Sequence, residues 1–244
     1  MRTVCLPREK SRTGPLVLVN RQHPLQPGGP VDLTAVDSRH PDILLDRQAA
    51  QLLAACVRKA GGGAEIVPVS GWRSQAEQQR IWDDTLAESG ADFTRKYVAY
   101  PGCSEHQTGL AIDLGRAAGH IDFIRPAFPY DGAFRKAAAA YGFIQRYRRE
   151  KEDLTGIAEE PWHFRYVGAP HARLMEENGL CLEEYPEFLR ERPRSCPLPD
   201  GRLAQVFYVP CAGEETEIQL PDGCCQVSGD NAGGFIVTAW GRPA

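Results

Sequence analysis

The sequence has no long apolar run, no large excess of charge of one sign and no internal repeat. Its apolar stretches, such as Pro15 to Val19, fall far short of the ~20 residues that a membrane-spanning helix needs. A formal net charge of −4 provides no strong basic field to hold nucleic acid or an anionic membrane. We therefore expect no membrane span and no nucleic-acid partner.

A secretory signal and C-x-x-C pairs are also missing. The N-terminus has basic residues but no apolar stretch of about 7–15 residues followed by small residues, so we expect a cytoplasmic protein. All eight cysteines are then expected to be free thiols in packing roles. Cys224 and Cys225 are adjacent, and the alternation of side chains along a strand predicts that they lie on opposite faces.

What is present is the composition of an ordinary globular protein. Of the 244 residues, 42% are hydrophobic and 25% are charged, which argues against disorder. Strand and helix patterns occur in mixed order, which indicates an α+β fold rather than regular βαβ repeats. From about residue 192, short strands joined by Gly, Asp and Asn turns take over. We predict a main domain at 1–190 and a small β-rich extension at 191–244.

Apolar periodicity and end signals locate the elements of the main domain. The patterns predict helices at 46–59, 74–88, 131–141 and 170–178, and strands at 65–69, 110–114, 143–147 and 163–167. Ser74 and Glu77 form an S-x-x-E capping box, and the helix that follows should end before Gly90. Arg73 therefore lies in the loop directly before a helix N-terminus. Pro68 indicates that its strand lies at the edge of a sheet or ends irregularly, because proline has no N–H to donate.

Asp113 is the first residue that points to chemistry, because it stands inside an apolar run. A carboxylate buried there without a partner would cost several kcal/mol, so it needs a cation or hydrogen-bond donors. Strand alternation places Asp113 on the face opposite Ile112, with the small Ala111 on its own side. His106 lies seven residues earlier, across Gly109, which allows a tight bend. These two side chains can converge on one metal ion.

A second segment, E-E-P-W-H-F-R-Y at 159–166, supplies another candidate ligand. His163 opens the predicted strand, and Glu160 lies three residues before it. Two imidazole nitrogens and one carboxylate oxygen, from His106, His163 and Asp113, would make a zinc site with one open position for water. Such a site lowers the pKa of the bound water to about 7, and Glu160 remains free to act as the general base.

Each of these residues also has an ordinary interpretation. A lone His106 is more often a surface or hydrogen-bonded histidine, and a lone Asp113 can be a buried cap. Glu159 and Glu160 can be a solvated acidic pair. Cys103 and His106 have C-x-x-H spacing, so a structural zinc site with a thiolate ligand is a further alternative, although it leaves Glu160 without a role.

Three motifs in order along the chain resemble the zinc D,D-peptidases of the VanY and VanX type, peptidase family M15. They are S-G-W-R-S at 70–74, S-x-H-x-x-G-x-A-x-D at 104–113 and E-P-W-H at 160–163. Flanking segments are similar to the bifunctional D,D-dipeptidase/D,D-carboxypeptidases of the VanXY type, at 16–20, 93–99 and 141–147. The similarity covers most of 15–190 and continues more weakly beyond. It implies a small central antiparallel sheet flanked by helices, of the hedgehog/D,D-peptidase kind, with a C-terminal β appendix.

The resemblance implies a role for each residue that matches a family motif. The zinc ligands would be His106, Asp113 and His163, the catalytic base Glu160, the oxyanion-stabilising cation Arg73, and the substrate-pocket residues Gln78 and Ser104. Tyr147 is a further candidate for substrate contact, with a core aromatic as the alternative. Trp72 departs from the tyrosine often found in the family, and Cys103 is not part of the family's ligand set.

The activity implied by the resemblance is hydrolysis of D-Ala-D-Ala and of the terminal D-Ala of peptidoglycan precursor peptides, with one Zn²⁺ per chain. This activity removes the target of vancomycin. A homodimer is left open. The alternatives are a cell-wall endopeptidase or endolysin of the same fold, which an export signal or wall-binding repeats would favour, and a non-catalytic zinc-stabilised binding module. The presence of both Glu160 and Arg73 argues against the binding module.

Overall fold

The structure is a computed structural model that describes residues 1–26, 31–63, 65–118, 120–123, 131–198 and 201–241. Contacts between residues divide the chain into two compact units. The central unit comprises Val19–Leu25 and Pro30–Ala172, and the terminal unit comprises Met1–Leu18, Gln26–Gly29 and Arg173–Ala244. Within the described ranges, no helix has the length and apolar character to cross a membrane.

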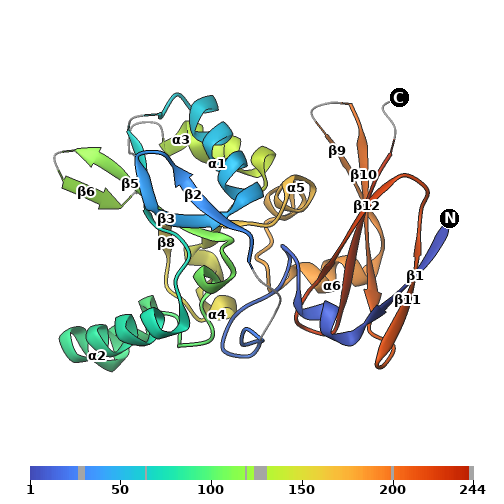
Figure 1. The fold of residues 1–244 in the computed structure, drawn as a ribbon, viewed down its shortest axis with the longest axis horizontal. Helices are drawn as coiled ribbons and strands as arrows, with labels where there is room; N and C mark the ends of the chain where they lie inside the picture. The colour runs from blue at the N-terminus through green and yellow to red at the C-terminus, as the bar shows by residue number, and fades with distance from the viewer. Residues whose placement is uncertain (27–30, 64, 119, 124–130, 199–200, 242–244) are drawn as a thin grey trace. The chain divides into compact units, whose positions relative to one another are not determined.

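The elements of both units are shown in Figure 1. The central unit contains β2 (Leu33–Asp37), β3 (His40–Asp46), α1 (Arg47–Lys59), β4 (Ile66–Ser70), α2 (Gln75–Tyr97), the 3-10 helix η2 (Glu105–Thr108), β5 (Ala111–Ala118), β6 (His120–Phe123), α3 (Asp131–Ala138), β7 (Phe143–Tyr147), α4 (Glu152–Thr155) and β8 (Glu160–Tyr166). The terminal unit contains β1 (Arg2–Pro7), α6 (Tyr185–Glu191), β9 (Arg194–Pro197), β10 (Leu203–Pro210), β11 (Glu215–Leu220), β12 (Cys224–Gly229) and β13 (Gly234–Trp240). α5 (Ala169–Glu177) includes residues of both units.

The central unit is built on one antiparallel sheet, as the resemblance implied. The strand order is β4-β5-β8-β7, and β6 pairs with β5. β4 is an edge strand whose register shifts between Pro68 and Ser70, which confirms the expectation for a strand containing proline. Across β5 and β8, Asp113 lies directly opposite His163. The two side chains therefore point to the same face of the sheet.

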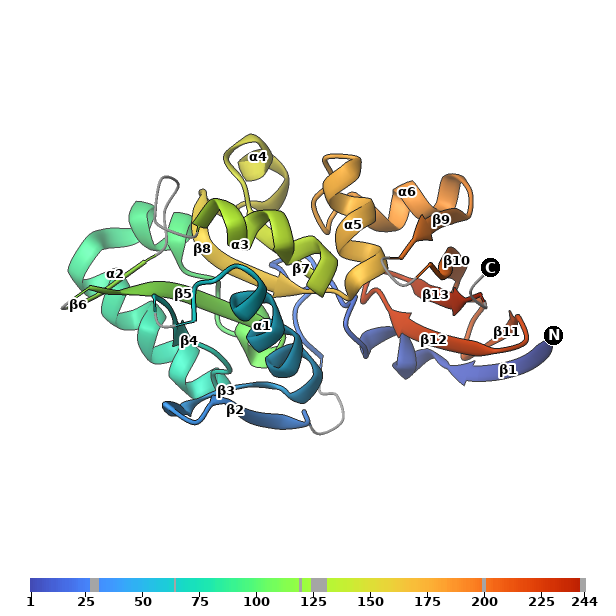
Figure 2. The same cartoon turned by 90° about the horizontal axis from the view of Figure 1, so that it is seen from above.

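The other face of this sheet carries the hydrophobic core. Ile112 of β5 and Phe164 of β8 are buried there in one cluster with Leu53 of α1 and Phe134 of α3. Figure 2 shows α1 and α3 over this face. Burying a side chain of this size contributes about 1.5–3 kcal/mol, so the apolar half of each strand determines which way Asp113 faces.

α2 begins as predicted but extends beyond the predicted end. The Ser74 hydroxyl accepts the backbone N–H of Glu77 and caps the helix. Gly90 has φ 78 and ψ 170, so it breaks the helix where the sequence indicated an end. Helical structure then resumes as far as Tyr97. This second half, which carries Phe93 and Tyr97, was not predicted from the sequence.

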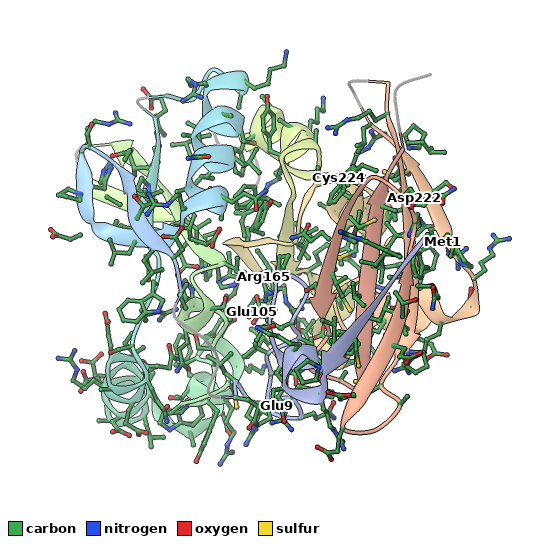
Figure 3. All side chains as sticks on the ribbon, turned by 45° about the vertical axis from the view of Figure 1, so that its right-hand side comes forward. Met1, Glu9, Glu105, Arg165, Asp222 and Cys224 are labelled. Carbon is green, nitrogen blue, oxygen red and sulfur yellow. The ribbon has the colours of Figure 1, made fainter. Side chains whose placement is uncertain are left out.

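The terminal unit consists mainly of strands, and β10 to β13 confirm the short strands predicted there. Four strands form a sheet in the order β12-β13-β10-β9, whereas β11 pairs with β1 from the N-terminus. Ile218 of β11 and Phe235 of β13 are buried in a common core. The amino group of Met1 lies 2.7 Å from Asp222 (Figure 3). The pairing of β1 with β11 was not predicted, and a domain boundary at residue 190 stays a prediction.

All eight cysteines are free thiols, as predicted. Cys225 packs against the core of the terminal unit while Cys224 is exposed, so the two lie on opposite faces of β12. The prediction that all eight serve packing is wrong for Cys5 and Cys224, which are both exposed. Their strands each have one face toward solvent, where a thiol contributes nothing to the core.

Candidate functional site

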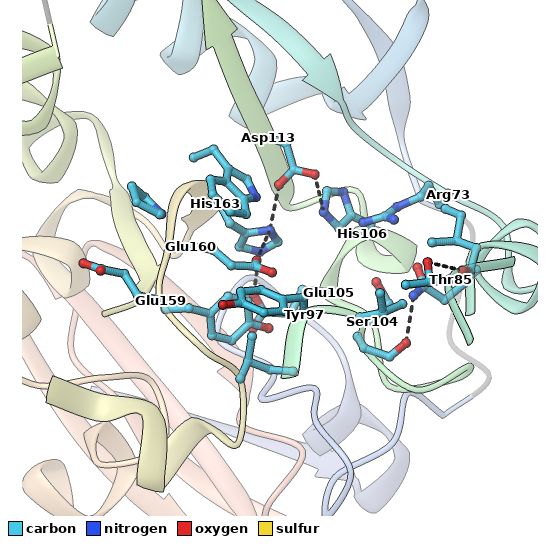
Figure 4. Close-up of a pocket in the computed structure, with 18 of the residues that line it drawn as sticks. Arg73, Thr85, Tyr97, Ser104, Glu105, His106, Asp113, Glu159, Glu160 and His163 are labelled. Atoms are coloured by element: carbon cyan, nitrogen blue, oxygen red, sulfur yellow. Dashed lines mark hydrogen bonds and ion pairs between the residues drawn. The ribbon is translucent and has the colours of Figure 1, made fainter. Parts of the chain in front are cut away.

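The polar face of the central sheet borders a cavity of about 850 Å³ (Figure 4). This volume is within the range typical of small-molecule sites. The cavity is lined by all eight site residues predicted from the sequence: Arg73, Gln78, Ser104, His106, Asp113, Tyr147, Glu160 and His163. They come from η2 and the residue before it, three strands of the sheet, the first turn of α2 and the loop before α2.

Three of these residues form a compact, buried cluster. His106, Asp113 and His163 each offer one ligand atom, and these atoms lie within 4.8 Å of one another. Nε2 of His106 is 3.3 Å from Oδ2 of Asp113, and Nδ1 of His163 is 2.9 Å from Oδ1 of the same carboxylate (Figure 4). The cluster therefore has two nitrogens and one oxygen facing a common point.

The protonation of His106 indicates that this point suits a cation. Nδ1 of His106 lies 2.6 Å from the carbonyl oxygen of Gly71, which can only accept, so Nδ1 carries the proton. Burial and the nearby Arg73 lower the pKa of His106 to about 4, so the ring is neutral at pH 7 and its Nε2 presents a lone pair. That lone pair faces the carboxylate of Asp113, and two acceptors repel each other unless a cation lies between them.

The donor set fits zinc in particular. Ligands about 2.0–2.1 Å from a tetrahedral Zn²⁺ lie roughly 3.3 Å apart, and in the structure one ligand atom from each residue lies within 4.8 Å of the other two. Three protein ligands leave one position open for water or substrate, as catalytic zinc sites do. Cys103 is outside this cluster and lines a second, smaller cavity. The arrangement therefore does not support the C-x-x-H alternative.

Two glycines allow His106 to reach this position. Gly109 ends η2 with φ 71, a left-handed conformation that turns the chain into β5 and confirms the expected bend. Gly71 lies so close to β3 that a Cβ there would be 2.2 Å from the carbonyl oxygen of Leu44. The loop that contains Gly71 can therefore lie against β3 while its own carbonyl accepts from His106.

Glu160 and Arg73 lie beside the cluster without belonging to it. Glu160 is buried, and its Oε2 is 3.8 Å from Nδ1 of His163. Burial raises the pKa of Glu160 to about 8. Arg73 is partly buried, and its Nε has no hydrogen-bond partner in the part of the chain that the structure describes. A proton acceptor and an unsatisfied cationic donor thus face the same cavity.

The three predicted substrate-binding residues differ in what they offer. The side-chain amide of Gln78 donates to the carbonyl oxygen of Ala99 at 2.8 Å, whereas its buried Oε1 has no partner among the described residues. The ring of Tyr147 is 5.0 Å from that of His163, centre to centre. Ser104 is buried in the cavity wall. Gln78 therefore has a free acceptor, and Tyr147 packs on a candidate ligand.

One residue of the site was missed by the sequence analysis. Glu105 is completely buried, and its Oε1 lies 2.7 Å from Nε of Arg146 and 2.9 Å from Nη1 of Arg165. Burial alone would raise the pKa of Glu105, but the two guanidinium groups outweigh it and hold the pKa well below its usual range. The available signal was the presence of two arginines, Arg146 and Arg165, inside predicted apolar strands.

Comparison with known proteins identifies the family. The family model VanY, D-alanyl-D-alanine carboxypeptidase, matches residues 42–169. The chain is also 40% identical over 184 residues to the bifunctional D-Ala-D-Ala dipeptidase and carboxypeptidase VanXYC of Enterococcus gallinarum, covering 73% of this chain and 97% of that protein. The chain therefore belongs to the VanY family of D-alanyl-D-alanine carboxypeptidases.

Solved structures agree with this assignment. The D,D-dipeptidase VanXYg, crystallised with a phosphinate analogue of D-Ala-D-Ala, is 48% identical with a TM-score of 0.92 and covers 98% of both chains. A VanY D,D-pentapeptidase variant from a VanB-type resistance cassette, in complex with Zn(II), is 33% identical with a TM-score of 0.61 and covers 70% of this chain and 98% of its own. The fold is thus that of the VanX and VanY D,D-peptidases, and the match to VanXYg includes the C-terminal strands.

Proposed function

We propose that this chain hydrolyses D-Ala-D-Ala and removes the terminal D-Ala from peptidoglycan precursor peptides, using a Zn²⁺ held by His106, Asp113 and His163. The observation that carries this proposal is the buried His-Asp-His cluster with Glu160 and Arg73 beside it in one cavity. The named activities of VanXYC and VanXYg support the choice of substrate. Because vancomycin binds the D-Ala-D-Ala terminus, the activity would contribute to vancomycin resistance.

A Zn²⁺ ion held by His106, Asp113 and His163 would supply a Lewis acid for the scissile carbonyl and would lower the pKa of a bound water molecule. Glu160 takes the proton from the attacking water and returns it to the leaving amine of D-Ala. A group that acts as base and then as acid needs a pKa near the working pH, and the burial of Glu160 shifts its pKa upward in that direction. The burial that raises this pKa also keeps bulk water away from the carboxyl group.

Arg73 binds the developing oxyanion. Arg73 directly precedes Ser74, the cap of α2. The start of the helix therefore holds the backbone from which the guanidinium enters the cavity. The unpartnered Nε–H provides a donor that no group in the described part of the chain already uses. A preset donor of this kind contributes about 10²–10³ in rate when charge develops on the substrate.

The remainder of the cavity supports a substrate longer than a dipeptide. Phe93 and Tyr97 of α2 line it, together with Arg149 from the short 3-10 helix before α4 and Glu159 from the segment after α4. The Arg149 guanidinium donates to Glu159 at 2.8 Å, in a pair of which the arginine is largely exposed. The carboxypeptidase part of the proposal requires such additional surface, whereas free D-Ala-D-Ala requires only the region around the cluster.

The test is D-Ala release from free D-Ala-D-Ala and from a pentapeptide ending in D-Ala-D-Ala. Release from both, lost with a chelator and restored by Zn²⁺, is the expected result. Cleavage only within cross-linked wall peptides would indicate an endopeptidase instead. Zinc binding without release from either substrate would indicate a binding module. The same sample should contain one zinc ion per chain. The cytoplasmic location and the homodimer stay predictions.

A further inference from the structure

The two imidazoles of the cluster are oriented by groups of different kinds. His106 turns Nε2 toward Asp113, and its other nitrogen donates to the backbone carbonyl of Gly71. His163 turns Nδ1 toward Asp113, and its Nε2 lies 3.6 Å from Oε2 of Glu105. The backbone therefore orients one ring, whereas a side chain lies behind the other.

Where His163 and Glu105 meet, two polar atoms lack a hydrogen-bond partner within the described part of the chain. Nε2 of His163 and Oε2 of Glu105 are both buried, and neither makes a hydrogen bond in the described residues. Their separation of 3.6 Å exceeds the usual N–H···O range by roughly half an ångström. They are complementary, since an imidazole whose Nδ1 binds a cation carries its proton on Nε2, and a carboxylate can accept it.

Glu105 is held in place from its other side. Its Oε1 is bound by Arg146 and Arg165, and the side chains of all three residues are completely buried. Figure 3 shows Glu105 and Arg165 close together in the interior. Both partners of Oε1 are donors only, so they orient the carboxylate and leave Oε2 directed at His163. The arginines come from β7 and β8, the latter being the strand that carries His163.

We propose that Glu105 is a positioning residue for the metal site. It accepts the Nε2 proton of His163 and so keeps the lone pair of Nδ1 directed at the cation. This inference rests on the proposed function, because it requires the cluster to hold Zn²⁺. Partners of this kind behind a metal-binding histidine commonly raise metal affinity and activity by about 10- to 100-fold.

Glu105→Gln is the most informative variant. It replaces one carboxylate oxygen by an amide nitrogen, so the side chain donates to Nε2 of His163 instead of accepting from it. The amide oxygen must face the arginines, which can only donate, so the amide N–H₂ group faces Nε2 of His163. That group stabilises the tautomer with the proton on Nδ1, which cannot bind metal. We expect zinc affinity to fall about 10- to 100-fold, measured by competition with a chromophoric chelator, and kcat to fall with it.

Two comparisons separate positioning from a structural role. Glu105→Asp retains a carboxylate and should recover most of the lost zinc affinity. Asp230→Asn removes a buried carboxylate that accepts backbone N–H groups in the terminal unit, so it should lower the melting temperature and leave zinc affinity unchanged. If Glu105→Gln likewise lowers only the melting temperature, with wild-type zinc affinity in the folded protein, the inference is wrong.

A measurement on the wild-type protein needs no variant at all. Two-bond ¹⁵N–¹H spectra of the zinc-loaded protein report which nitrogen of His163 carries the proton, and we expect Nε2. A proton on Nδ1, with zinc bound at Nε2, would overturn the inference even if Glu105→Gln does not fold. Failure of the proposed function is recognised separately, because the wild-type protein would then bind no zinc or release no D-Ala.

Discussion

Nδ1 of His163 lies 2.9 Å from Oδ1 of Asp113, although 50 positions separate the two residues along the chain. The sheet explains this contact, because β5 and β8 are antiparallel neighbours in which the two residues are paired. Their sequence neighbours Ile112 and Phe164 point into the core on the other face. The same packing that stabilises the central unit therefore assembles half of the cluster and limits its movement.

Replacing Glu160 with glutamine should abolish turnover while zinc stays bound. Glu160 lies outside the His-Asp-His cluster, and the amide cannot accept a proton from water. We expect kcat to fall about 10²–10⁴-fold at unchanged zinc content, measured by D-Ala release and metal analysis of the same sample. Near-wild-type turnover in this variant would show that another group is the base.

Arg73→Lys should lower kcat more than it raises KM. Lysine keeps the charge but cannot reproduce the position of the Nε–H of Arg73, which has no hydrogen-bond partner among the described residues. A loss of about 10²-fold in kcat is expected, because the interaction matters most when the oxyanion forms. Arg80→Lys, an exposed change on α2, is the matched control. An equal effect of both variants would contradict the assigned role.

Gln78→Met should weaken substrate binding. The substitution keeps the length of the side chain but removes the buried Oε1 that has no partner in the described residues. We expect KM to rise roughly 10-fold, the effect of losing one hydrogen bond to a charged or polar group. The next residue, Gln79, is exposed and donates to Asp83, so Gln79→Met should change KM little. An unchanged KM in Gln78→Met would exclude substrate contact at this position.

The metal-free protein should lose stability as the pH rises from about 6 to 9. Burial raises the pKa of Glu160 to about 8, so between about pH 4.5 and pH 8 this group binds a proton in the folded chain but not in the unfolded chain, and the effect levels off above pH 8. Burial lowers the pKa of His163, but the hydrogen bond to Asp113 and the nearby carboxylate of Glu105 outweigh burial and raise this pKa to about 9. The stabilisation by His163 is therefore complete below about pH 6.5 and is lost as the pH rises toward 9. Both groups therefore lower the free energy of unfolding as the pH rises, because a pKa that is higher in the folded than in the unfolded chain favours folding at low pH.

Urea unfolding of the metal-free protein at pH 6 and pH 9 measures this effect. The free energy of unfolding should fall with pH, and Glu160→Gln should remove a share of about 1–3 kcal/mol from the difference, since one pKa unit corresponds to about 1.4 kcal/mol. A pH dependence that is identical in wild type and Glu160→Gln would mean that Glu160 titrates alike in the folded and unfolded states.

Much of the architecture follows from local patterns. The helix cap at Ser74, the edge strand containing Pro68 and the bend at Gly109 were each predicted and found. The strand β1 was missed because it pairs with β11, some two hundred residues away. The strands β2 and β3, which pair with each other, were also not predicted. The second half of α2 was missed because the sequence pattern of a glycine that interrupts a helix is the same as that of a glycine that ends one.

The candidate ligands and the base stand in three short motifs with fixed spacing, so the proposed chemistry could be predicted from the sequence. A buried aspartate in an apolar strand needs a cation or hydrogen-bond donors in any fold. The alternation of side chains along the strand then determines which face of the sheet the aspartate occupies. The tertiary structure alone decided which atoms meet. The opposite use of ring nitrogens in His106 and His163, and the pairing of Glu105 with two arginines from β7 and β8, depend on the register of the sheet and on burial, which no local pattern encodes.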